Sequence, residues 1–99
     1  MYLLCFDSIL KIKGIFEISH GGISQAVIDP KNIFSRALLV GATGITLVHN
    51  HPAGSLIFTQ ADDIVTNEIN AVCKILHIRF LDHIIIGNGY VSARELARI

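Results

Sequence analysis

Two histidines and a later aspartate have the residue types and the spacing of a metal site. His49 and His51 are separated by one residue, so on a strand their imidazoles share a face, about 7 Å apart along the chain. Asp62 follows a turn at Pro52 and falls in the first turn of an expected helix, where an anion is favoured. Catalytic zinc takes three nitrogen or oxygen ligands from the protein and keeps a fourth position for water. The pattern therefore predicts a zinc site built from His49, His51 and Asp62.

A simpler role competes with metal binding at Asp62. The pattern Thr59-x-x-Asp62 has the spacing of a capping box with Asp in place of Glu, which stabilises a helix start by about 1 kcal/mol. Taken alone, this spacing favours a cap, and His49 and His51 alone could be ordinary loop histidines. Because the three candidate ligands occur together with a turn and a helix start, metal ligation is the preferred interpretation. The cap stays open as an alternative, since a carboxylate turned toward a metal is less free to cap.

The remaining histidines fit structural roles. His83 lies in an apolar run and is expected to be a core histidine with satisfied hydrogen bonds rather than a ligand. His20 and His77 are expected to face solvent at the ends of elements. Asp7, between two β-rich runs, is expected to form a turn.

The elements that must position these residues follow from hydrophobic periodicity and turn signals. A helix is expected to begin at Asp29-Pro30, because Asp caps a helix well and proline suits its first position, and Gly41 is expected to end it. A last short helix is expected at the capping pattern of residues 92–95. Strands are expected at 2–7, 9–18, 23–28, 44–48 and 78–86, and a second helix at about 60–76. This order predicts an α/β fold, one mixed sheet with helices packed on it.

Composition limits the classes of function. The 99 residues allow one domain. Because 52% of them are hydrophobic and only 16% are charged, some of the apolar residues are expected to form an interface, either in a homodimer or with another protein partner. Eight basic residues balance eight acidic ones, which gives no support to nucleic-acid binding. The longest nearly apolar stretch, 37–48, is too short to span a membrane. Cys5 and Cys73 are expected to be buried thiols, which favours the cytoplasm.

Two runs of residues resemble a known motif. His-Asn-His-Pro-Ala-Gly at 49–54, followed by Thr-Gln-Ala-Asp at 59–62, resembles the JAMM metal motif as RadC-family proteins carry it. Residues 81–87 and 21–24 also resemble that family, so the similarity extends from about Tyr2 to the C-terminus. The chain is thus similar to the JAB/MPN metallopeptidase-like domains of the RadC family.

The resemblance implies a cytidine-deaminase-like α/β fold in which His49, His51 and Asp62 hold zinc for the hydrolysis of a peptide or isopeptide bond. Zinc acidifies water and polarises a carbonyl, so this chemistry needs few further groups. Thr59 stands where the family usually has a serine that helps to hold the oxyanion, and its hydroxyl could donate in the same way. This makes Thr59 a candidate catalytic residue.

Two departures from the family pattern leave two functions open. The loop at 55–58 is apolar and free of proline, and the glutamate that serves the family as general base falls before Met1. We therefore expect a single domain over residues 1–99 that lacks the segment with this glutamate, and Glu17 is a weaker candidate for the base than for an ordinary strand residue. One function is a zinc-dependent JAMM-type metallopeptidase. The other is a non-catalytic or truncated MPN-like interaction domain that binds zinc and pairs with another subunit.

Overall fold

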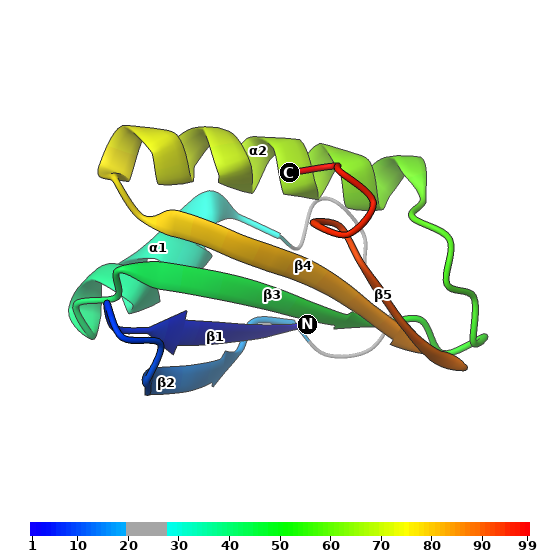
Figure 1. Ribbon diagram of the computed structural model, residues 1–99, viewed down its shortest axis with the longest axis horizontal. Coiled ribbons are helices and arrows are strands. Elements are labelled where there is room, and N and C mark those ends of the chain that lie inside the picture. The colour runs from blue at the N-terminus through cyan, green and yellow to red at the C-terminus, as the bar shows by residue number, and fades with distance from the viewer. Residues whose placement is uncertain (20–27) are drawn as a thin grey trace.

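A five-stranded mixed sheet carries the candidate site. The computed structural model describes residues 1–19 and 28–99, and its strands lie in the order β2-β1-β3-β4-β5 (Figure 1). Among these described strands, only the β3–β4 pair is parallel. The strands are β1 (Tyr2–Phe6), β2 (Ile12–Glu17), β3 (Gly44–Asn50), β4 (Arg79–Gly87) and β5 (Gly89–Ser92), and the helices are α1 (Pro30–Leu39) and α2 (Gln60–Leu76). The predicted α/β class, a mixed sheet with helices packed on it, is confirmed.

Both helices pack on the same face of the sheet. In α1, Ile33, Phe34 and Ala37 are buried, and they belong to one apolar cluster with buried residues of α2. The strand residues of that cluster, Leu3 and Leu47 among them, are paired neighbours in the sheet and so point to one side. In Figure 1, α2 runs along the top of the view, above β4. The core therefore lies between this face and the two helices.

The helix starts follow local chemistry. The side chain of Asp29 accepts a hydrogen bond from the Lys31 N–H at 2.9 Å, and Pro30 opens α1, as the sequence predicts. Helix α2 ends at Leu76, and its C-cap residue His77 takes the left-handed conformation at φ 56° and is exposed. Asp7 forms the predicted turn, because its Oδ1 accepts from the N–H groups of Ile9 and Lys11, each at 2.9 Å.

One prediction is wrong, and two others concern residues that the structure does not describe. The predicted helix at 92–95 is wrong: Ser92 ends β5, and only turns follow. The Ser92 hydroxyl does accept from the Glu95 N–H at 3.1 Å, but it also donates to Asp82 at 2.5 Å, and Ala97 adopts φ 57°. These tertiary and backbone constraints stop a continuing helix. The strand predicted at 23–28, except Ile28, and His20 lie outside the described residues.

Candidate metal centre

The end of strand β3 positions the two histidines. His49 is inside β3 and only 6% exposed, and its side chain points to the helix-covered face of the sheet. His51 lies just past the strand, yet its N–H still donates to the Ile86 carbonyl at 2.8 Å. The hydrogen bonding between β3 and β4 thus extends to the second histidine. Both imidazoles are therefore held by the sheet, as the alternation of strand side chains predicts.

The first turn of α2 positions Asp62. Its carboxylate oxygen Oδ2 accepts from the Thr59 N–H at 2.7 Å and from the Thr59 hydroxyl at 2.8 Å, while the Asp62 N–H donates to the Thr59 hydroxyl at 3.2 Å. This is a complete capping box, so the capping interpretation is confirmed. Capping and metal binding do not compete here in the way the sequence suggested, because the same carboxylate also faces both histidines. The cap holds Asp62 in place for them.

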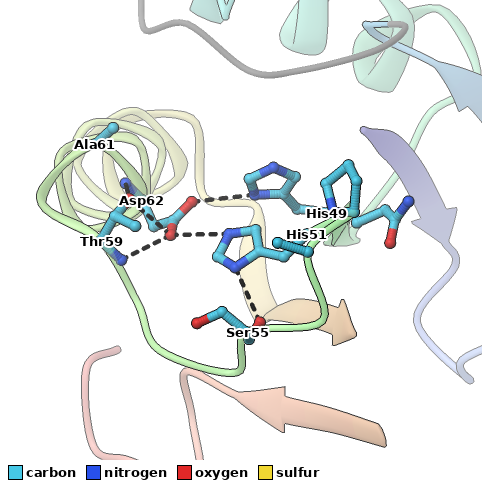
Figure 2. A pocket seen from close by; sticks show the side chains of 9 residues that line it. His49, His51, Ser55, Thr59, Ala61 and Asp62 are labelled. Carbon is cyan, nitrogen blue, oxygen red and sulfur yellow. Dashed lines mark hydrogen bonds and ion pairs between the residues drawn. The ribbon is translucent and has the colours of Figure 1, made fainter. Parts of the chain in front are cut away.

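The three side chains converge on one point (Figure 2). His49 Nδ1 lies 3.0 Å from Asp62 Oδ1, and His51 Nε2 lies 3.2 Å from Asp62 Oδ2. One ligand atom from each residue lies within 4.8 Å of the others. Tetrahedral zinc with ligand bonds of about 2.0–2.2 Å separates its ligand atoms by roughly 3.3 Å. The donor set and its spacing therefore fit a metal ion.

The hydrogen bond of His51 decides which of its nitrogens faces the site. His51 Nδ1 lies 3.1 Å from the Ser55 carbonyl oxygen, and a carbonyl only accepts, so Nδ1 carries the hydrogen. In the neutral ring, Nε2 then presents a lone pair toward Asp62. Metal-binding histidines use this arrangement, in which the second nitrogen donates to a carbonyl and fixes the tautomer. Two acceptors at 3.2 Å repel each other unless a cation or a proton lies between them.

His49 supports the same conclusion. Its buried Nδ1 has no aligned hydrogen-bond partner, although Asp62 Oδ1 is close. Burial lowers the pKa of His49, against the opposing effect of the Asp62 charge, so the neutral ring that metals bind is favoured. Burial alone would raise the pKa of Asp62, but the Thr59 hydrogen bonds and the two histidines bring it below its usual value. The two shifts therefore favour the carboxylate form of Asp62 and the neutral imidazole form of His49.

A second buried pair supports the site from behind. His83 is fully buried, and its Nδ1 lies 2.7 Å from the Thr66 hydroxyl, which itself donates to the Asp62 carbonyl at 2.9 Å. Since the one hydroxyl hydrogen is used there, His83 Nδ1 must donate, and its Nε2 is left without a partner. The ring stacks on His49 with 6.2 Å between centroids. His83 is thus a core histidine, as predicted, but only one of its two nitrogens is satisfied.

The site opens into a pocket of about 280 Å³. Its lining includes the three candidate ligands, Thr59 and the turn at Pro52, so the candidate ligands are accessible from this side. The oxyanion role predicted for Thr59 stays a prediction, because its hydroxyl hydrogen is given to Asp62 in this arrangement.

Two glycines fasten the loop that follows His51. Gly54 has φ +84°, and its N–H donates to the His51 carbonyl at 2.9 Å, while its own carbonyl accepts from the Asn88 N–H at 3.1 Å. A Cβ at Gly87 would lie 2.7 Å from the backbone of Gly54, so only glycine permits this approach. The loop that carries the Ser55 carbonyl is therefore tied to the β4–β5 turn.

Glu17 is not among the residues that the fold brings to the site. It pairs with Tyr2, which in turn pairs with Val48, so all three lie on the sheet face opposite the one to which His49 points. The sequence did not predict the hydrogen bond between His51 and the Ser55 carbonyl, because a backbone group is present at every residue and gives no sequence signal. Sequence reasoning also missed Thr66, whose place one helical turn after Asp62 was a usable signal.

Fold and site together are those of a JAB-type domain in which His49, His51 and Asp62 could hold a metal ion. A family model for the RadC-like JAB domain matches residues 1–98, and the chain belongs to this family. It is 43% identical over 80 residues to a UPF0758 protein of Haemophilus ducreyi (80% of this chain, 36% of the relative). It is 41% identical over 95 residues to a UPF0758 protein of Finegoldia magna (95% and 43%), and 36% identical over 94 residues to one of Pelobacter propionicus (94% and 41%). The chain thus spans about two fifths of the length of these relatives.

Proposed function

We propose that this domain binds zinc through His49, His51 and Asp62 and belongs to a JAMM-type metallopeptidase that acts on peptide or isopeptide bonds. The observation that carries the proposal is the 3.2 Å approach of the His51 Nε2 lone pair to Asp62 Oδ2, which only a cation or a proton relieves. When bound, zinc supplies Lewis acidity, since it polarises a carbonyl and lowers the pKa of water to about 7.

The protein residues would orient the reaction. His51 is fixed by the Ser55 carbonyl and Asp62 by Thr59, so the ligand set is organised before a metal arrives. A peptide would approach through the pocket, whose lining includes Pro52. Thr59 would turn its hydroxyl from Asp62 toward the developing negative charge on the carbonyl oxygen.

A second candidate function is an interaction domain that keeps the metal without efficient catalysis. Within residues 1–19 and 28–99, no further acidic side chain joins the three ligands, so none is assigned to move a proton from water to the leaving nitrogen. A positioned acid–base group typically contributes 10²–10⁴-fold. We therefore expect this chain to bind zinc and to hydrolyse peptides slowly.

Its free, buried Cys5 and Cys73 accord with a reducing compartment, and we propose the cytoplasm.

Metal binding is tested by element analysis and by titration against a zinc chelator. His49→Ala, His51→Ala and Asp62→Asn are each expected to weaken zinc binding at least tenfold. Asp63→Ala is the matched control, because Asp63 lies beside Asp62 at the same helix start but pairs with Arg98 at 2.8 Å. Stoichiometric zinc in the His49→Ala/His51→Ala double variant would refute the site.

Catalysis is tested separately with a peptide library, with and without chelator. Slow, chelator-sensitive cleavage supports a metallopeptidase that works below its full rate, and zinc binding with no cleavage supports the interaction domain. Fast cleavage that Glu17→Gln abolishes would show that the base is Glu17, against its place on the opposite face of the sheet.

A further inference from the structure

The second face of the sheet has no helix on it among the described residues. Strand pairing fixes which side chains this face carries, because paired residues point to the same side. Tyr2, Leu4 and Val48 point to this face, whereas Leu3 and Leu47 point to the other face, toward the core. The apolar members are Tyr2, Leu4, Phe6, Ile12, Ile15, Val48, Ile84, Ile86 and Tyr90, and together we call them the open face.

A β-bulge adds to the open face. The register between β1 and β2 shifts between Cys5 and Phe6, so that Phe6 pairs with Ile12 while Leu4 pairs with Ile15. Without the shift, Ile12 would point to the same side as Cys5, toward the core. The bulge therefore places two isoleucines, 56% and 57% exposed, on one side of the edge strand.

Most pairs of this sheet are antiparallel, and an antiparallel sheet commonly leaves one face in solvent with polar side chains on it. The open face differs because many of its exposed side chains are apolar. Tyr2, Ile86 and Tyr90 are 48%, 44% and 62% exposed, so large apolar side chains stand in solvent from β1 to β5. Contiguous apolar patches of several hundred Å² mark interaction sites.

We propose that a second copy of this chain covers the open face and forms a symmetric homodimer by packing sheet on sheet. Taking about 200 Å² for each fully exposed side chain of this size, the open face offers roughly 600 Å² per chain. Two copies would then bury roughly 1,200 Å², the lower end of the range for stable interfaces. A two-fold axis lets the same residues meet on both sides, as in most dimers.

The charges on this face are of both signs, because strand pairing places Glu17, Arg79 and Asp82 on it. Asp82, on the open-face side of β4, is held by the Ser92 hydroxyl at 2.5 Å and by the N–H groups of His83 and Arg94. Its carboxylate is thus used within the chain. The chain has no net charge, so two copies meet without long-range repulsion.

The test compares open-face variants with helix variants by analytical ultracentrifugation over a wide range of concentrations. Ile15→Glu and Tyr90→Glu lie on strands at opposite edges of the sheet, and each is expected to weaken dimerisation at least tenfold. Leu39→Glu and Ile75→Glu are the controls, because these side chains are more exposed, at 81% and 75%, but lie on helices. Circular dichroism and zinc content show whether each variant keeps its fold.

Several results would overturn the proposal. A chain that stays monomeric at all concentrations would mean that another protein or further polypeptide covers the open face. Helix controls that weaken the dimer as much as the open-face variants would place the interface elsewhere. Loss of the dimer with Ile15→Glu but not with Tyr90→Glu would indicate pairing through the edge of β2 instead of the face. Retention of the dimer in His49→Ala supports the proposal independently of the metal.

Discussion

Acidification should destabilise this fold through His83. The side chain is fully buried, and burial lowers its pKa from 6.5 to about 4. Between these two values the unfolded chain binds a proton that the folded chain does not. The contribution of neutral His83 to the free energy of unfolding is therefore fully present above about pH 6.5, and it is lost as the pH falls toward 4. A gap of about 2.5 units at 1.36 kcal/mol each gives a loss of about 3 kcal/mol.

Urea unfolding at pH 7, 5.5 and 4 measures this loss, in the presence of chelator because metal binding has its own pH dependence. His83→Leu is the matched variant: it keeps the apolar volume and leaves the Thr66 hydroxyl bonded to the Asp62 carbonyl. His49, whose pKa is also lowered by burial, contributes with the same sign, so the quantity of interest is the stability of the wild type minus that of the variant. The free energy of unfolding of the wild type should fall by about 3 kcal/mol relative to that of the variant from pH 7 to pH 4. Parallel pH profiles of the two proteins would refute the reasoning.

Three further predictions concern the core, the helix start and the metal. Ile69→Ala, at a position only 1% exposed, should cost about 2–5 kcal/mol in urea unfolding while zinc stoichiometry is unchanged, and a loss of zinc would contradict it. Thr59→Ala should cost about 1 kcal/mol and raise the pKa of Asp62, measured by NMR titration without metal, whereas Thr59→Ser should resemble the wild type. Zinc at about 100 times its Kd should stabilise the wild type by about 2.7 kcal/mol in thermal unfolding and should do much less for Asp62→Asn.

The sequence predicts the parts of this domain that depend on short-range signals. The start of α1 at Pro30 and the capping box of Thr59 and Asp62 are local hydrogen-bond patterns, and both occur where their residues indicate. The His49 and His51 pair follows from the alternation of a strand, and the strand ends beside the start of α2. The fold class, and the convergence of His49, His51 and Asp62 as candidate ligands, could therefore be predicted without any long-range information.

Features that depend on distant contacts could not be predicted in the same way. The pattern at 92–95 is a good helix start in isolation, but Ser92 bonds to Asp82 on another strand. The pairing of Thr66 with His83 joins α2 to β4, and periodicity alone does not set which faces meet. Amphipathic helices also do not say which face of a sheet they will cover. The open face was visible in the sequence only as an apolar surplus with no location.

The contact between Gly54 and Gly87 has a consequence for how natural sequence variation in this domain should be interpreted. Even a methyl group at Gly87 would displace the backbone of Gly54, and Ser55, the next residue, holds the tautomer of His51 through its carbonyl. An alanine at position 87 touches no ligand, yet in a screen for metal-deficient alleles it should group with substitutions of the ligands themselves.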